Sequence, residues 1–291
     1  MSATLTFHLA LTGTVDEIVL LDTNENLLKA HVMDISQGIS EVSRTVVRAG
    51  RAPDLTGSDI VMLGASIRPD NVVSRDDFLT GNLGIVREAA ANIAKYCPDA
   101  VVINVTAPTD VFNYLFYKFI GGDRRKFIGY NYNDTLRLKW ASAQVLGATT
   151  DRVDAVVLGE HGDKQVPLYE QIYLDKQKVL LSSEQKQRIA ELVNNWFSTY
   201  SSLKSGRSAG WTSAIGLERI IAAIVQKGDE PIPCSVIADG EYGQKNTSIG
   251  LPVMLGPGGV QKIIEMEISD QSQKLLSEAA DKITKMANTC L

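Results

Sequence analysis

The run Val101-Val102-Ile103-Asn104-Val105 decides the fold, because it is short, apolar and rich in β-branched residues, and it follows a helical pattern at about 75–96. Earlier parts of the chain repeat this arrangement, with a helical pattern at 23–36 and strand-like runs at 17–21, 45–47 and 59–63. Short valine- and isoleucine-rich runs that alternate with helices predict a parallel, doubly wound sheet. Residues 1–125 are therefore expected to form a Rossmann-like α/β domain.

The second half of the chain has a mixed pattern. From about residue 140 we expect a hairpin near 171–181, helices near 183–203 and 212–227, strands near 234 and 251, and a closing helix from about Asp270. This mixture predicts a second, α+β domain over residues 126–291. Since no repeat or flexible linker separates the halves, we expect the two domains to be packed together.

Composition restricts the class of protein. The 291 residues carry a formal charge of -5 with both signs mixed, which argues against a nucleic-acid surface, and 44% hydrophobic content can supply a core. No apolar run approaches membrane-spanning length, and the first residues lack a signal-peptide pattern, so a cytoplasmic protein without a membrane partner is expected. The three cysteines are scattered and lack metal-ligand spacing, so we expect no metal site; they are Cys97, Cys234 and Cys290.

The segment Gly159-Glu160-His161-Gly162-Asp163 directly follows the apolar run Ala155-Val156-Val157-Leu158. An imidazole titrates near neutral pH, so His161 at such a strand end could take a proton from a hydroxyl and return it. The alternative is a polar turn with an incidental histidine. The pentapeptide alone leaves both interpretations open.

A second polar group opens a helix-like run further upstream. Asp134 and Arg137 are three residues apart, so they can face one cleft from the first helical turn. A carboxylate beside an imidazole fixes its tautomer, and an arginine can bind a substrate carboxylate through two parallel hydrogen bonds. For this pair alone, a helix-start aspartate and a solvated arginine are the more common finding.

These motifs resemble the lactate/malate dehydrogenase family, and the resemblance runs through nearly all of the chain in the family's order. It implies an NAD-dependent oxidoreductase that transfers a hydride between the nicotinamide and a small 2-hydroxy acid. Domain 1–125 would then bind the dinucleotide, and domain 126–291 would bind substrate and carry catalysis. The matching segments are 74–79, 101–111, Asp134 with Arg137, 159–163, 239–243 and 249–253.

The cofactor residues follow partly from position and partly from the resemblance. Asp22, after the first strand-like run, lies where an acid would bond the adenosine ribose hydroxyls, and its charge favours NAD over the 2'-phosphorylated cofactor. An aspartate that merely caps the next helix is about equally compatible with the local sequence. The resemblance further implies that Ala65, Asn82 and Val105 approach the cofactor.

One departure from the family is large. The first strand and its Gly-x-Gly-x-x-Gly turn are missing, and only Gly13 occurs early in the chain. Without that central strand its neighbours would lie roughly 10 Å apart and could not pair. The loss of about five buried apolar side chains would remove on the order of 10 kcal/mol. We therefore expect an incomplete copy of a longer enzyme, truncated at its N-terminus, and no cleanly formed native sheet.

A second departure concerns the substrate. Thr106-Ala107-Pro108 stands where the family has Thr-Asn-Pro, whose asparagine amide reaches substrate and cofactor. Alanine cannot make that hydrogen bond, and losing it would cost ~1–3 kcal/mol.

The resemblance assigns a role to each polar residue. His161 would accept the hydroxyl proton, Asp134 would orient the imidazole, and Arg137 would hold the substrate carboxylate. Arg75, on a loop able to close, would polarise the carbonyl oxygen; the alternative is a solvated residue at a helix start. Arg68, with one residue of slippage, would accept a second carboxylate and favour malate over lactate.

Two alternatives remain. A catalytically impaired relative could serve as an oligomer subunit or binding protein, which the missing glycine turn and Ala107 both allow. A generic α/β dehydrogenase with an unrelated substrate agrees poorly with the three polar residues. For an active enzyme, the resemblance implies a homo-oligomer, a dimer or tetramer.

Overall fold

Strands and helices alternate through the first half of the chain. The computed structural model describes residues 1–67, 75–205 and 209–291, with 75–77 described through their backbone only. The elements of this half are α1 (Ser2–Thr12), β1 (Glu17–Leu20), α2 (Glu25–Gly38), β2 (Val46–Ala49), β3 (Ile60–Leu63), α3 (Arg75–Tyr96), β4 (Val101–Asn104), α4 (Thr109–Ile120) and β5 (Phe127–Gly129).

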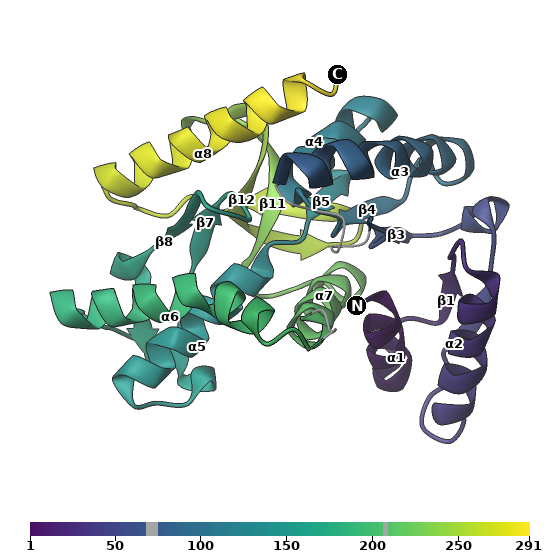
Figure 1. Ribbon diagram of the computed structural model, residues 1–291, viewed down its shortest axis with the longest axis horizontal. Helices are drawn as coiled ribbons and strands as arrows, with labels where there is room; N and C mark the ends of the chain where they lie inside the picture. The colour runs from purple at the N-terminus through teal and green to yellow at the C-terminus, as the bar shows by residue number, and fades with distance from the viewer. Residues whose placement is uncertain (68–74, 206–208) are drawn as a thin grey trace.

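The parallel strands of this half fall into two sheets. β1 pairs with β2 alone, Ile18 lying opposite Val47, whereas β3, β4 and β5 form the start of a larger sheet. Among the described residues no strand joins β1 to β3. Figure 1 shows β1 and α2 on one side of the molecule, with α1 between them and helix α7 (Gly210–Gln226). The division lies where the family order requires another strand.

Helix α1 connects the two parts of the first half. Leu5 and Leu9 are buried in the main hydrophobic core, while Ala10, on another face of the helix, packs into a separate cluster. We call that cluster the N-terminal core; its buried members are Ala10, Ile35, Ile39 and Val47. The β1–α2–β2 unit therefore rests on a core of its own.

The second half mixes hairpins with long helices. Its elements are α5 (Tyr132–Leu146), β6 (Val153–Asp154), β7 (Val157–Gly159), β8 (Gln165–Pro167), β9 (Tyr173–Leu174), β10 (Gln177–Lys178), α6 (Ser183–Ser202), α7, β11 (Ile232–Asp239), β12 (Lys245–Gly256), β13 (Gly259–Ile263) and α8 (Asp270–Asn288).

One sheet crosses from the first half into the second. Its strand order is β3-β4-β5-β11-β12-β7-β8, with β13 beside β12, and every pairing from β5–β11 onward is antiparallel. In Figure 1, α3, α4 and α8 lie above this sheet and α5, α6 and α7 lie below it. Both faces are thus covered, which agrees with the fully buried pattern of β4.

The predicted fold class is confirmed, and the expected strands and helices are present. The helix α4 was missed, although its buried face, including Phe112 and Phe116, fills the space above the sheet. The predicted hairpin near 171–181 corresponds to β9 and β10, which are antiparallel. Within the described ranges, none of the helices has both the length and the apolar composition needed to cross a membrane.

Candidate active site

A glycine turn carries His161 from the end of β7 toward the start of α5. Gly159 has φ +90°, a conformation that favours glycine, and a Cβ there would lie 2.7 Å from the carbonyl oxygen of Lys164. The backbone N–H of Glu160 donates to that same oxygen at 3.3 Å, which closes the β7–β8 hairpin. The turn therefore places His161 at the tip of a paired, buried strand.

Helix α5 supplies the two partner side chains. Its first turn contains Asp134, whose backbone N–H donates to the carbonyl of Asn131 at 3.1 Å. The hydroxyl of Thr135 accepts a hydrogen bond from the backbone N–H of Val157 at 3.0 Å, which ties the start of α5 to β7. This cross-link brings the acid of α5 to the imidazole that follows β7.

The structure brings His161, Asp134 and Arg137 together. Asp134 Oδ2 lies 2.7 Å from His161 Nδ1, and Asp134 Oδ1 lies 3.5 Å from Arg137 Nη1. The Asp134 side chain is 6% exposed, whereas those of His161 and Arg137 are 31% and 19% exposed. A hydrogen bond at Nδ1 leaves Nε2 for a reacting group.

The pKa of the His161 imidazole is raised. Burial opposes the charged form and by itself lowers this pKa, but the charge of Asp134 and its hydrogen bond more than offset burial. The carboxylate of Asp110 raises the pKa further, and Arg137 acts in the opposite direction. The site thus stabilises an imidazolium, the form that appears after His161 has accepted a proton.

Asp110 was missed as a functional residue. It lies in α4, is 2% exposed, and its Oδ2 accepts a hydrogen bond from the backbone N–H of His161 at 2.7 Å. Burial raises the pKa of Asp110 to about 6, against the opposing effects of Ser235 and His161. The sequence signal was an acid in the first turn of a helix beside the Ala107–Pro108 turn, a pattern that is as common in plain helix starts.

Glu160 was also missed. It is 6% exposed, its Oε2 accepts from the backbone N–H of Lys164 at 3.0 Å, and its Oε1 lies 2.8 Å from Nζ of Lys282 in α8. A second ion pair, between Lys164 and Glu278, joins the same hairpin to α8 at 2.8 Å. Two ion pairs therefore join the histidine turn to α8.

The predicted cofactor residues lie near the carboxyl ends of the parallel strands. Asp22 is exposed beyond β1 and accepts a hydrogen bond from the backbone N–H of Asn24 at 2.8 Å, while Asn24 itself caps α2. Ala65 is exposed beyond β3, and its carbonyl accepts from the hydroxyl of Thr106 at 2.7 Å. Val105 follows β4 and is partly exposed.

Asn82 is buried beneath the exposed strand ends and bonds to the backbone on both sides of it. It is fully buried; its Oδ1 accepts from the backbone N–H of Ile67 at 2.8 Å, and its Nδ2 donates to the carbonyl of Ala107 at 2.9 Å. These bonds join the segment after β3 to the turn after β4. Its contact with a cofactor stays a prediction.

Two predicted arginines cannot be placed. Arg68 lies outside the described residues. Arg75 is the first residue of α3, which agrees with the alternative of a residue at a helix start. Only its backbone is described, so the direction of its side chain is not part of the structure. Ala107 is exposed at this edge, and its methyl group cannot donate a hydrogen bond to a ligand.

The exposed strand ends fit the adenosine part of an NAD molecule. The fit rests on an exposed acid beyond β1 and on the exposed residues Ala65 and Ser66 beyond β3, since nucleotides bind outside the carboxyl ends of such strands. Among the described residues this edge contains no glycine-rich turn for the phosphates. The residues present thus match part of the dinucleotide.

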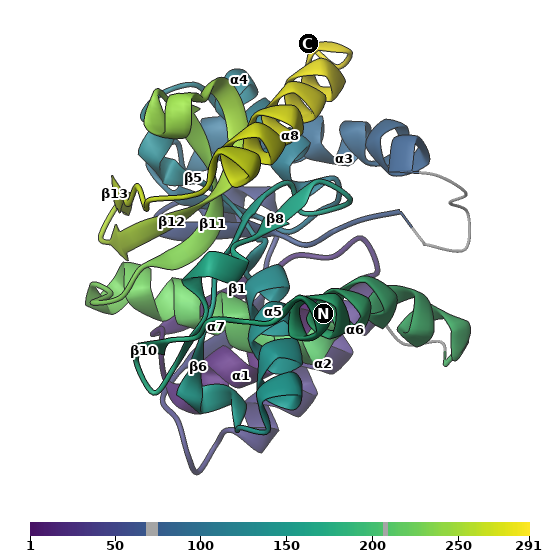
Figure 2. The ribbon, with the colours of Figure 1, turned by 90° about the vertical axis from the view of Figure 1, so that its left-hand side faces the viewer.

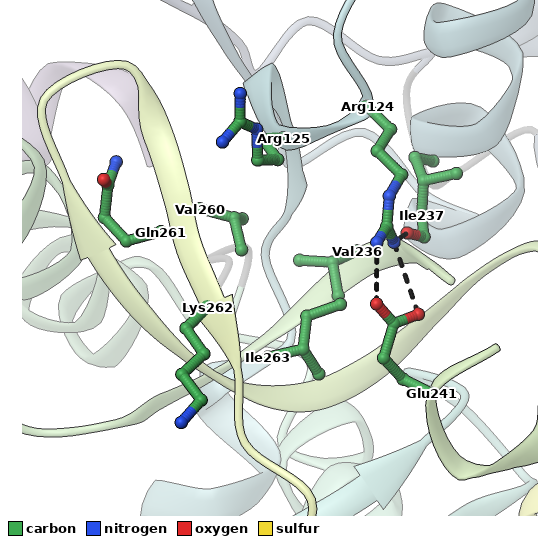
Figure 3. A pocket seen from close by; sticks show the side chains of 9 residues that line it. All are labelled: Arg124, Arg125, Val236, Ile237, Glu241, Val260, Gln261, Lys262 and Ile263. Carbon is green, nitrogen blue, oxygen red and sulfur yellow. Dashed lines mark hydrogen bonds and ion pairs between the residues drawn. The ribbon is translucent and has the colours of Figure 1, made fainter. Parts of the chain in front are cut away.

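A hollow of about 240 Å³ lies away from these residues. Figure 3 shows Arg124 facing Glu241 there, with a shorter contact of 2.7 Å and a longer one of 3.3 Å, and Arg124 also donates to the carbonyl of Ile237. Since each charge satisfies the other, the pair is a structural cross-link. Among the described residues no cluster suited to a metal ion occurs.

Similarity to known proteins covers the whole chain. Residues 1–129 match the lactate/malate dehydrogenase NAD binding domain, and residues 133–291 match the family's α/β C-terminal domain. The malate dehydrogenase of Sulfurimonas denitrificans is 34% identical over 96% of this chain and 89% of its own length. That of Haloferax volcanii is 30% identical over 95% and 91%.

A solved structure shows the same fold. The lactate dehydrogenase of Cryptosporidium parvum, complexed with lactic acid and nicotinamide adenine dinucleotide, has a TM-score of 0.92 and 27% identity, over 99% of this chain and 94% of that one. The predictions of the fold, of NAD as cofactor and of an oxidoreductase are confirmed by these similarities. The chain belongs to the lactate/malate dehydrogenase family.

Proposed function

We propose that the chain catalyses the reversible transfer of a hydride between C2 of malate and NAD. The observation that carries this proposal is the cluster of His161, Asp134 and Arg137, which combines a proton acceptor, its orienting acid and a carboxylate anchor. The choice of malate over lactate is supported by the malate dehydrogenases among the relatives.

Proton transfer falls to His161. Its Nδ1–H donates to Asp134, so Nε2 is the acceptor for the proton of the substrate hydroxyl during oxidation. Asp134 holds the ring in this tautomer and stabilises the imidazolium. The chemistry that NAD supplies when bound is the uptake or release of the hydride.

Substrate and cofactor are held by residues from both halves. Arg137 binds the carboxylate next to C2, since a guanidinium can donate two parallel hydrogen bonds to it. Asp22 bonds the adenosine ribose, and Ala65, Val105 and Asn82 form or support the cofactor pocket. The exposure of Asp22 and Ala65 beyond their strands supports these roles.

Two further arginines complete the proposed site. Arg75 polarises the carbonyl oxygen during reduction, and Arg68 binds the second carboxylate of malate. Replacing Arg68 by glutamine should raise the KM for malate far more than that for lactate, because only malate carries the second charge. Equal effects on both substrates would remove this role of Arg68.

The proposal is tested by NADH oxidation with purified protein. Oxaloacetate should support turnover at a kcat/KM well above that of pyruvate. NADH binding without turnover of either acid by a folded protein would favour the catalytically impaired relative. Faster turnover of pyruvate would keep the enzyme class and reject malate.

The partners and the location of the protein are also proposed. We expect a small 2-hydroxy or 2-oxo acid as substrate, a homo-oligomer, and a cytoplasmic enzyme. The mass of the purified protein from light scattering checks the second of these, and cell fractionation checks the third.

A further inference from the structure

The arginine of the active site is stacked on an aromatic ring. The guanidinium carbon of Arg137 lies 4.8 Å from the ring centroid of Trp196, a side chain of α6. A cation at this distance over an indole face is attracted to the ring. In addition, the Trp196 ring lies parallel to that of Tyr200, with centroids 5.2 Å apart and an angle of 9°.

Helix α6 is built to place this stack. Its first turn is closed by a capping box in which the side chains of Ser182 and Gln185 each accept from the other's backbone N–H. Ile189 and Val193 are buried, and Trp196 follows Val193 by three residues on the same helix face. Figures 1 and 2 both show α6 running beside α5, the helix that carries Arg137.

The ring lies against the guanidinium and leaves its N–H groups to other partners. The five N–H groups of arginine lie in the guanidinium plane, so contact through the face does not use them. In the described part of the chain, the one hydrogen bond of this guanidinium is the long 3.5 Å contact with Asp134. One long bond orients a planar group poorly, whereas the ring face restricts its tilt.

We propose that Trp196, supported by Tyr200, is a positioning residue that holds the edge of the Arg137 guanidinium toward the substrate carboxylate. The inference rests on the proposed function, because it assumes that Arg137 binds the acid. Trp196 itself does not touch the reacting atoms. Its contribution is to restrict Arg137 before substrate binds, so that Arg137 loses less conformational freedom on binding.

Substitutions at Trp196 separate the ring face from mere bulk. Trp196→Phe keeps a weaker aromatic face, and Trp196→Leu keeps apolar volume only. The KM for the acid should rise about threefold to tenfold in the leucine variant and less in the phenylalanine variant, with kcat changed by less than about twofold. Phe197→Leu is the matched control, since Phe197 is the next residue on α6 and is 66% exposed.

A change in kcat at constant KM, or a leucine variant equal to the unaltered protein, would overturn the inference. An equally raised KM in Phe197→Leu would do the same, because it would indicate a general disturbance of α6.

A binding measurement without turnover separates this inference from the proposed function. Oxalate, a non-reactive dicarboxylate, is added in the presence of NAD, and the rise in Tm is recorded. The rise should be clear in the unaltered protein, smaller in Trp196→Leu and absent in Arg137→Gln. The Tm without oxalate reports whether each variant is folded.

The outcomes differ for the two proposals. An undiminished rise in Trp196→Leu overturns the role of Trp196 while leaving the enzyme function intact. The role of Trp196 is also overturned if Tm does not rise in the unaltered protein or rises equally in Arg137→Gln. In either case Arg137 is not the anchor of the acid. If Tm rises in the expected pattern but no acid is turned over, the role of Trp196 is supported. Only the proposed function is then contradicted.

Discussion

The substrate region and the nucleotide region hold their functional side chains in opposite ways. Asp134 is 6% exposed and bound to His161, and the histidine turn is joined to α4 by Asp110 and to α8 by Glu160. Asp22 is exposed, and its recorded hydrogen bond is to its own loop. The side chains proposed for proton transfer are therefore held by buried cross-links, whereas the acid proposed for nucleotide binding lies on a surface that is held less firmly.

The sheets that carry the two regions also differ in how firmly they are held. The histidine follows a strand of the large mixed sheet, but β1 belongs to a two-stranded sheet over the N-terminal core. A two-stranded sheet is marginal unless something packs against it, and here that support comes from α1 and α2. We expect the β1–α2–β2 unit to open more readily than the rest.

The largest effect is expected at the proton acceptor. His161→Asn removes the group that takes the hydroxyl proton, so kcat should fall about 10²- to 10⁴-fold while the fold is kept. Steady-state rates with oxaloacetate and malate measure it. His31→Asn, in α2 of the other region, is the control, and comparable losses in both variants would contradict a special role for His161.

The next effect concerns stability and the buried Asp110. Its pKa of about 6 in the folded protein exceeds the ordinary value of 3.8, so the folded state keeps a proton that the unfolded state has lost. The free energy of unfolding should therefore fall by about 2 kcal/mol as the pH rises from about 4 to about 6. Asp110→Asn should remove this fall, as measured by urea unfolding across that range.

The control for Asp110 is an exposed acid. Asp99 has a side chain that is 98% exposed, and its pKa is lowered by the hydrogen bond to Lys126. Asp99→Asn should therefore keep the slope of the unaltered protein between about pH 4 and 6. An unchanged slope in Asp110→Asn would mean that Asp110 is already ionised in the folded protein.

A smaller effect is expected at Asp134. Asp134→Asn removes the carboxylate that raises the pKa of His161, so the pH midpoint for malate oxidation should move to lower pH. The limiting rate should fall about tenfold to hundredfold, because the imidazole loses the hydrogen bond that orients it. Such a hydrogen bond contributes ~1–3 kcal/mol. The pH profile of kcat/KM measures both. A lower rate with an unmoved midpoint would indicate a purely structural role.

The smallest effect tests the nucleotide region directly. Ile35→Val removes one methylene from the N-terminal core and should cost about 1 kcal/mol, which speeds amide exchange in β1 and β2 about fivefold. The matched variant Ile189→Val lies in another hydrophobic cluster, packed around α5 and α6. It should leave exchange in β1 and β2 unchanged. Equal acceleration there in both variants would mean that the two regions open together.

Local sequence was sufficient for most of the fold. The apolar runs at 101–105 and 59–63 became neighbouring parallel strands, because uninterrupted valine and isoleucine suit a sheet covered on both faces. The helix α4 was missed, since its buried tyrosines and phenylalanines resemble a strand-forming composition. The antiparallel extension of the sheet was not predicted, because pairing between distant segments leaves no local signal.

The site was predictable only in part. The grouping of His161, Asp134 and Arg137 was predicted because each belongs to a motif with its own chemistry and the motifs together resemble a family. Asp110 and Trp196 were not found, since an acid at a helix start and an aromatic residue in an amphipathic helix have many ordinary explanations. Their partners lie far away in the sequence.

The sequence by itself determined most of the elements, the family and the proposed acid, base and anchor, because periodicity and motifs are properties of short segments. Only the tertiary structure decided which side chains share a dry environment. It set Asp110 behind His161, laid Trp196 under Arg137, and left β1 apart from β3. The physical reason is that burial and charge interactions depend on distances between segments that meet only in the folded chain.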